Sequence, residues 1–514
     1  MRFLTVAAAL AASIAATPIG ADAQTAPPRA SAAAPDAAGV RADLARAMRA
    51  AQDNDVQGEL SILAAVIASP AFAQLTSSER HSAYLVAGLA DLQTGRGDAA
   101  HPLLKAASVM PEALSIDWEG RLLAALDAGA MDDAVISLTT LARRFPASVN
   151  QVEDATVLRL ADEAGRLPQG ATWRLELLSA LDDAHWSPSD PLVDASGVWR
   201  DFARGLLAAR QPARAIAVAG RVTDPAVVVE MRAEKLFDPV TRADPARFDP
   251  EAAAARRIDV LRAEVEAAPD RLAGLNALAN AFTAAGRDAE ALRTLDQAIA
   301  RGAPADGSAT SFTDVKDQLV WTRYLRAYAL AHLDRHDEAL AQMLQVTRSP
   351  DHRLLDQLDL ISLARMYGLV GRSKDALNAV GQVSAPDLSA YGRMQLELTR
   401  AIAEAQLNDQ PRLARAVAEA RPHAAEAPSE FTTLLLVAGD LDGAAALFIE
   451  RLAAPAERAD ALLELQDWRI PPGNTAFERE IDRRLKQVRA RPDVQSALAQ
   501  DGRIGHYDLN GPTF

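Results

Sequence analysis

The 514-residue chain contains no cysteine and few aromatic residues. The lack of cysteine excludes disulfide bonds, zinc–cysteine sites, thiol catalysis and a lipidated N-terminal cysteine. Aromatic residues make up only 5% of the chain and alanine is abundant, a composition that favours closely packed helices over strands. The chain is also poor in lysine and acidic overall, with 69 Asp and Glu against 54 Lys and Arg. This balance argues against a nucleic-acid partner, whose binding surface would be basic.

A chain of this length is too long for one compact core, so we expect two or more domains or one repeat array. Hydrophobic residues make up 49% of the sequence, which is too many for a chain dominated by disorder.

The first residues have the pattern of an export signal. Arg2 precedes an apolar stretch over residues 3–16, and the small residues Ala21 and Ala23 offer a cleavage site. The alternative is a membrane anchor, but fourteen apolar residues are too few to span a bilayer, which needs roughly 20. We therefore predict a signal peptide over residues 1–23, cleavage near Ala23, and a periplasmic or secreted mature protein.

Residues 24–40 are rich in Ala and Pro and have no periodicity, so they are predicted to form a disordered leader. Farther along, the best candidate for a membrane span is 431–449, which Asp440 and Asp442 interrupt. We therefore expect no stable insertion into a membrane.

A repeat of 34 residues is the most informative pattern. Tyr84, Gly95 and Ala100 recur 34 positions later as Trp118, Gly129 and Ala134, and proline closes each unit at Pro111 and Pro146. Related units contain Leu275, Leu278, Ala279, Phe282, Gly286, Ala291, Leu295 and Ala298, then Leu360, Leu363, Ala364, Tyr367, Gly371 and Ala376. Gly439 and Ala444 lie two periods after Gly371 and Ala376.

Each repeated residue type has a physical role in a pair of helices. Small residues such as Ala279 and Ala291 let the first helix (A) approach the second helix (B), and Phe282 fills the space between them. Gly286 stands where helix A stops, since a left-handed backbone costs glycine nothing. Pro111 stops a B helix because proline cannot continue it.

These residues and their spacing resemble the tetratricopeptide repeat (TPR) family. The resemblance is clear over 80–146, 272–304 and 356–384. It is weaker over 321–350, where Asp334 replaces the turn glycine, and over 151–222 and 391–425. A generic, irregular helical array is the alternative for the degenerate parts. The resemblance implies an all-α fold, a TPR-like α-solenoid of antiparallel helix pairs.

The solenoid is predicted to fall into two segments, 41–222 and 251–465. A Pro-rich connection over 223–250 separates them, and residues 466–514 are predicted to form capping helices and a tail. Thr475 followed by Glu478 is a capping-box signature, and the charged helix that it begins suits the open end of a solenoid. A membrane-surface helix is the alternative, but its charges would be of one sign.

The sequence shows no pattern typical of a catalytic or cofactor site. It contains no HExxH, GxSxG, phosphate-binding glycine loop or GxGxxG. His332 and His336 have the spacing of metal ligands on a helix, but Asp334 stands where the repeat turn is expected and would break that helix. We predict no metal, no cofactor and no enzymatic activity. Lytic transglycosylases also use helical arrays, but the residues after Leu465 are too few for their catalytic domain.

The resemblance further implies that A helices line a concave groove, with the fifth and ninth positions of each unit facing it. We predict a binding groove that contains Asn276, Asn280, Tyr324, Tyr328, His332 and Arg365. The amides would bind backbone groups of a partner, the tyrosine rings would bind its side chains, and Arg365 would bind an acidic group. The alternative is that these residues are solvated or pack between repeats. In 80–146 the matching positions are the mainly apolar Leu85, Leu89, Glu119 and Leu123.

The sequence thus predicts an exported, non-catalytic scaffold or adaptor that binds a protein or an extended peptide segment of the cell envelope. The competing hypothesis is an envelope enzyme or glycan-acting protein with a helical frame, and a deep pocket with two buried carboxylates would favour it.

Overall fold

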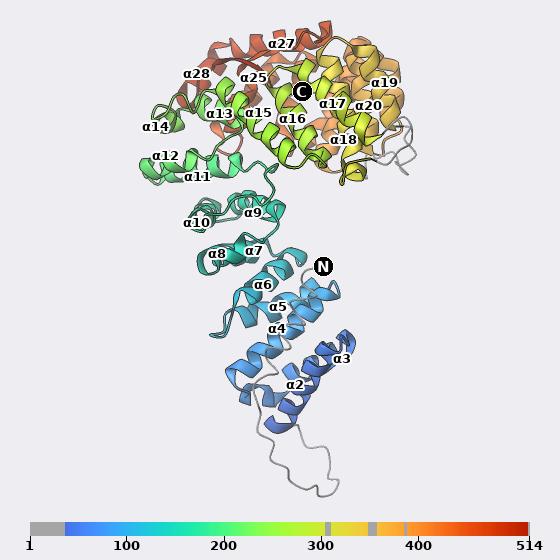
Figure 1. Ribbon diagram of the computed structural model, residues 1–514. Coiled ribbons are helices and arrows are strands. Elements are labelled where there is room, and N and C mark those ends of the chain that lie inside the picture. The colour runs from blue at the N-terminus through green and yellow to red at the C-terminus, as the bar shows by residue number, and fades with distance from the viewer. Residues whose placement is uncertain (1–35, 304–309, 348–356, 385–387, 512–514) are drawn as a thin grey trace, which may run out of the picture. The chain divides into compact units, whose positions relative to one another are not determined.

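The computed structural model describes residues 36–303, 310–347, 357–384 and 388–511. The described chain is an all-α solenoid in which consecutive helices pack as antiparallel pairs, with a single pair of short strands (Figure 1). It divides into two compact units, Met1–Val198 and Trp199–Phe514, which are described separately. The predicted signal peptide (1–23) and most of the predicted leader lie outside the described residues.

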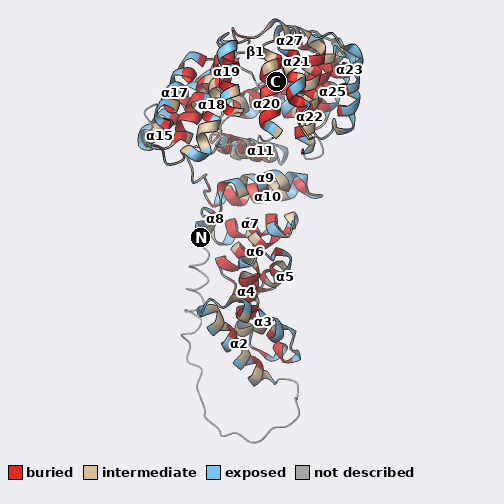
Figure 2. Ribbon diagram, turned by 90° about the vertical axis from the view of Figure 1, so that its right-hand side faces the viewer, coloured by how far each residue is buried: buried red, intermediate tan, exposed pale blue. Residues whose placement is uncertain are grey.

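The first unit consists of helix pairs connected by short turns. Its elements are α2 (Ala37–Gln52), α3 (Val56–Ala68), η1 (Pro70–Gln74), α4 (Ser77–Gln93), α5 (Gly97–Ser108), α6 (Ser115–Asp127), α7 (Met131–Arg144), α8 (Pro146–Val149), α9 (Asp154–Arg166) and α10 (Gly170–Asp183). Buried residues lie where neighbouring helices face one another (Figure 2).

The second unit begins within α11 (Ser196–Ala208) and contains the larger share of the pairs. Its first elements are α12 (Pro212–Ala219), α13 (Pro225–Ala233), η2 (Lys235–Phe237), α14 (Asp238–Thr241), α15 (Pro250–Ala267), α16 (Leu272–Ala284), α17 (Asp288–Gly302), α18 (Val315–His332) and α19 (His336–Thr347). They are followed by α20 (Gln357–Leu369), α21 (Ser373–Val380), α22 (Ala390–Gln406), α23 (Gln410–Ala420), η4 (Arg421–His423), α24 (Pro428–Ala438) and α25 (Leu441–Ala453). The last are α26 (Arg458–Glu464), β1 (Asp467–Arg469), α27 (Ala476–Arg489), α28 (Pro492–Asp501) and β2 (His506–Asn510).

A left-handed residue connects the two helices of most pairs, as the repeat predicted, and α9–α10 is an exception. The turn glycines Gly95, Gly129, Gly286, Gly371 and Gly439 have φ between 68° and 79°. Asn54, Arg210, Asp334 and Asn408 take the same conformation at the same place, with φ between 56° and 61°. The turn without glycine at Asp334, and the degenerate pairs α11–α12 and α22–α23, therefore keep the geometry of the repeat.

The structure corrects two predicted boundaries. Helix α2 begins at Ala37, after its N-cap Asp36, so residues 37–40 are helical rather than part of a leader. The compact units separate between Val198 and Trp199 rather than at 223–250.

The predicted Pro-rich connection over 223–250 contains α13, η2 and α14. Three of its four prolines, Pro225, Pro239 and Pro250, begin helices instead of interrupting them, and Pro245 lies in a turn. Pro225 and Pro250 occupy first-turn positions behind the N-caps Asp224 and Asp249, where a proline loses no helical hydrogen bond. Helix α13 packs against α15 and α26.

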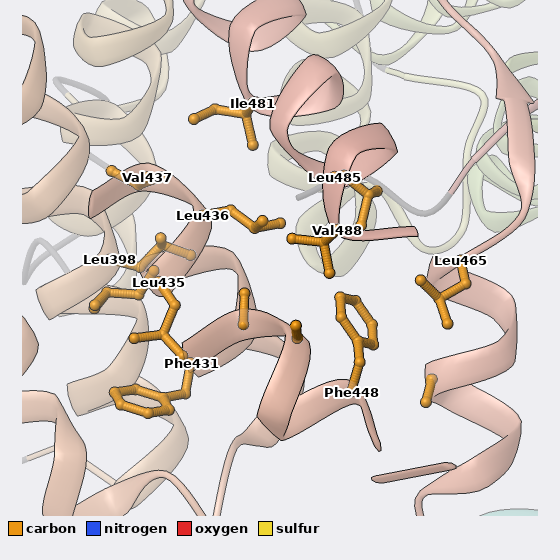
Figure 3. Packing of buried hydrophobic residues seen from close by; sticks show 14 of the residues in the cluster. Leu398, Phe431, Leu435, Leu436, Val437, Phe448, Leu465, Ile481, Leu485 and Val488 are labelled. Carbon is orange, nitrogen blue, oxygen red and sulfur yellow. The ribbon is translucent and has the colours of Figure 1, made fainter. Parts of the chain in front are cut away.

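The predicted capping box is present in the C-terminal segment. Thr475 and Glu478 cap each other's backbone N–H at the start of α27. The buried face of α27 consists of Ile481, Leu485 and Val488, which point toward Leu436 and Phe448 of the solenoid (Figure 3). The strand β2, which pairs in parallel with β1, was not predicted.

The second unit closes on itself. Helix α13, near its start, packs against α26, near its end, and the backbone N–H of Arg503 donates to the carbonyl of Ala233 at 2.8 Å. The segment before α27 also contacts the turn after α18, because the N–H of Gly473 donates to the carbonyl of His332 at 2.9 Å. In Figure 1 the red α28 lies near the green α13 and α14, and Nζ of Lys235, which follows α13, donates to the carbonyl of Ala499 in α28.

Candidate binding face of the second unit

The predicted groove residues lie on the A helices α16, α18 and α20 and form two rows. We call Asn276, Tyr324 and Ile361 the fifth-position row, and Asn280, Tyr328 and Arg365 the ninth-position row. Within a helix, the two positions are four residues apart and therefore share a face.

The fifth-position row is buried and joins neighbouring A helices. Asn276 is 3% exposed, and its Nδ2 donates to Oε1 of Gln318 on α18 at 3.2 Å. The hydroxyl of Tyr324 donates to the carboxylate of Asp359 on α20. Ile361 belongs to a hydrophobic cluster with Ala376 and other buried residues. For this row, packing between repeats explains the side chains.

The ninth-position row has access to solvent. Asn280 is exposed, and Tyr328 and Arg365 are partly exposed. Among the described residues, these three side chains have no recorded hydrogen bond or ion pair. An amide, a phenol and a guanidinium group on consecutive A helices are therefore available to a partner.

Trp321 extends this surface and was not recognised in the sequence. It lies three residues before Tyr324 and seven before Tyr328, so all three occupy one face of α18. Its side chain is 53% exposed, and its ring centroid lies 6.5 Å from that of Tyr324. The aromatic spacing i, i+3, i+7 was the signal that could have identified it.

His332 is already engaged within the chain. Its Nδ1 lies 2.7 Å from Oδ1 of the buried Asp288 and 3.5 Å from Nδ2 of Asn510. His336 begins a different helix and contacts Asp334 at 3.2 Å. The left-handed turn at Asp334 thus places the two histidines on different helices, as expected from the position of Asp334 at the repeat turn. Within the described ranges, no three His, Cys, Asp or Glu side chains cluster as metal ligands.

In the first unit, an ionic cluster around the buried Asp133 of α7 joins the helices α5, α6 and α7. Asp133 accepts from Arg121 at 2.6 and 2.8 Å, from Nε2 of His101 at 2.8 Å, and contacts Lys105 at 3.0 Å. Burial opposes ionisation of Asp133, but these hydrogen bonds outweigh it and hold its pKa below the usual value. Of the predicted apolar positions, Leu85 is buried.

Comparison with known proteins adds little to this description. No family model matches the chain, and no curated protein does either. A solved structure, described as the crystal structure of the APC/C hetero-tetramer Cut9-Hcn1, is similar over 90% of this chain and 95% of that chain. The identity is 11% and the TM-score is 0.29. The TPR-like solenoid is assigned here from the helix pairs and their left-handed turns.

No helix in the described part of the chain is both long and apolar enough to cross a membrane.

Proposed function

We propose that the protein is an exported scaffold or adaptor that captures an extended segment of a cell-envelope protein. The observation that carries this proposal is the ninth-position row, whose three polar side chains face solvent on consecutive A helices. Export, to the periplasm or the medium after cleavage near Ala23, rests on the sequence pattern of residues 1–23.

The row has the chemistry to bind a peptide in extended conformation. The amide of Asn280 offers both a donor and an acceptor to a peptide backbone. The rings of Tyr328 and Trp321 offer flat apolar surface, and Arg365 offers a bidentate donor to a carboxylate. The segment that fits best has an acidic side chain near Arg365 and an apolar or aromatic side chain near α18.

A pull-down from envelope extract tests the proposal. Mature protein, residues 24–514, is compared with a triple variant that carries Asn280→Ala, Tyr328→Ala and Arg365→Ala. We expect the variant to lose a discrete partner that the wild type retains, with little change in melting temperature because the three side chains make few internal contacts. Gln297→Ala, an exposed amide on α17, is the control and should retain the partner. Equal retention by the triple variant and the wild type would refute this binding face.

The competing enzyme hypothesis requires a deep pocket with two buried carboxylates. One cavity, with a volume of about 170 Å³, is lined by Arg393, Met394, Glu397, Glu419, Ala420 and His423. Glu419 is half exposed and Glu397 is paired with Arg400 at 2.6 Å. This cavity therefore does not supply the carboxylate pair, and the scaffold proposal has the better support.

A further inference from the structure

The strand β2 lies in a site that is built like a peptide-binding site. It pairs in parallel with β1, with Asp467 opposite His506 and Trp468 opposite Tyr507. Along the strand, Tyr507 and Leu509 are buried while His506 and Asp508 are exposed. This alternation is typical of a strand that binds with one face.

The buried face occupies an apolar socket formed by segments distant in sequence. Tyr507 and Leu509 join Val229 of α13 and Ala254 of α15, with Ala285, Leu463 and Trp468 at the periphery. The ring centroids of Tyr507 and Trp468 are 5.5 Å apart. Both inward-facing side chains thus enter a cluster in which the other residues come from helices and β1.

A polar socket receives the last residue of the strand. Nδ2 of Asn510 donates to the carbonyl of Thr283 at 2.7 Å and lies 3.4 Å from Oδ1 of Asp288. Gly511 follows, and a Cβ at this position would lie 2.6 Å from Cγ of Trp468. The site therefore selects an aromatic residue, an aliphatic residue two positions later, and then Asn-Gly.

The strand lies at the edge of a sheet of only two strands. Among the described residues, β1 is the only strand that pairs with β2, and β1 has three residues. On the other side, the N–H of Asp508 is satisfied by a side chain, Oε1 of Glu251 at 3.1 Å. Short peripheral segments of this kind open locally without unfolding the rest of a domain.

We propose that the socket between β1, α13, α15 and α16 is a second peptide-binding site, which β2 fills as an internal ligand. An extended segment of a partner protein with the pattern Tyr-x-Leu-Asn-Gly enters it by replacing β2 and pairing with β1, as in other cases of strand addition. This site is separate from the ninth-position row, and the two proposals are tested independently. The tether gives β2 an effective concentration in the millimolar range, so a partner segment competes well only when β2 is weakened or displaced.

The experiment uses full-length protein and a fluorescent peptide of residues 504–511. In the variant Tyr507→Ala/Leu509→Ala, β2 no longer fills the apolar socket, so the labelled peptide should bind. Wild-type protein should bind the same peptide at least about tenfold more weakly, because its site is occupied by the tethered strand. Asn510→Ala, a milder change that keeps both apolar side chains, should give an intermediate affinity.

Peptide variants show whether binding uses the site described. Gly511→Ala in the peptide should weaken binding because its Cβ collides with Trp468. Asp508→Ala, at a side chain that is 84% exposed, is the matched control and should bind like the unmodified peptide. Equal affinity of wild type and double variant, or no binding to a folded double variant, would overturn the proposal. Loss of helical circular dichroism in both protein variants would also overturn it, because a replaceable strand must be dispensable for the fold.

Discussion

At the scale of single residues, counting from the left-handed turn residue of each helix pair shows which positions repeat and where a pair departs from the repeat. Five residues after most of the left-handed turns within helix pairs, the chain places a buried alanine, at Ala100, Ala134, Ala215, Ala291, Ala339, Ala376 and Ala444. The pair α22–α23 has the buried Leu413 at this position. The first pair, α2–α3, has Glu59 at this position, and it is 5% exposed. Burial, together with the nearby Asp55, raises the pKa of Glu59 to about 7.

The raised pKa of Glu59 makes the first pair less stable at neutral pH. The folded state binds the proton more tightly than the unfolded state, whose pKa is about 4.5. Stability is therefore lost as pH rises from about 4.5 to about 7 and is constant above that. Glu59→Ala should remove this dependence. The stability of the variant minus that of wild type should therefore be higher at pH 8 than at pH 4 by on the order of 3 kcal/mol.

Hydrogen exchange of α2 and α3 at the two pH values measures this local stability. Glu176→Ala, at a half-exposed side chain, serves as the control and should leave the pH dependence unchanged. An unaltered pH dependence in Glu59→Ala would show that the Glu59 carboxylate is solvated in the folded state.

Gly473 is required for close contact between backbones. A Cβ there would lie 1.9 Å from the carbonyl oxygen of Ala331 and 2.6 Å from the amide nitrogen of Asp334. Gly473→Ala should therefore destabilise the second unit by about 2 kcal/mol, measured as a lower midpoint in urea. Gly197→Ala is the matched control, since a Cβ there meets nothing within 4 Å. A Gly473→Ala midpoint equal to that of wild type would mean that the loop moves away at no cost.

At the scale of elements, the sequence predicted the helix pairs well because each pair repeats a local code of small residues, a turn residue and a terminating proline. The prediction at 223–250 failed because proline is common both in the first turn of a helix and in irregular loops, so its presence alone does not distinguish the two. The N-caps Asp224 and Asp249 were the distinguishing signals. The strand β2 was not predicted because its socket is assembled from residues more than 200 positions away, such as Val229 and Ala254. Of the groove, the sequence placed both rows on A helices, but the burial of Asn276 and Tyr324 depends on how neighbouring repeats pack.

The capping box of α27 should contribute measurably to closure of the second unit. Thr475 accepts from the N–H of Glu478 at 3.2 Å, and its own N–H donates to the Glu478 carboxylate at 2.7 Å. Thr475→Ala should lower the free energy of unfolding by about 1 kcal/mol in denaturant titrations. Thr140→Ala, whose hydroxyl donates only to the carbonyl of Ile136 in its own helix, should have a much smaller effect. Equal effects of the two substitutions would contradict a special role for the cap.

At the scale of the whole molecule, closure of the second unit changes how stability spreads along the chain. In an open solenoid each repeat contacts only its neighbours, so a local defect stays local. Here Leu462 of α26 is fully buried and belongs to one hydrophobic cluster with Ala233 of α13. A defect at this contact should therefore affect both ends of the unit.

Leu462→Ala should lower the free energy of unfolding by about 2–5 kcal/mol. It should also raise the rate of hydrogen exchange in α13 and α15 as well as in α25 and α26. Leu295→Ala, a buried change in the middle of the repeats, should raise exchange mainly in α16–α18. If the effect of Leu462→Ala stayed within α25–α28, the second unit would behave as an open array.

The contact between α13 and α26 also determines how the second unit would respond to mechanical load. An open solenoid extends like a spring, and its ligand-binding positions move apart as it stretches. In the second unit, however, the chain enters at α11, where Arg204 contacts Glu234, and leaves through β2, which packs against α15. Tension between residues 199 and 511 would therefore shear β2 and the α13–α26 contact before it reached α16–α25. The spacing of Asn280, Tyr328 and Arg365 would stay constant under a pull that would distort an open array.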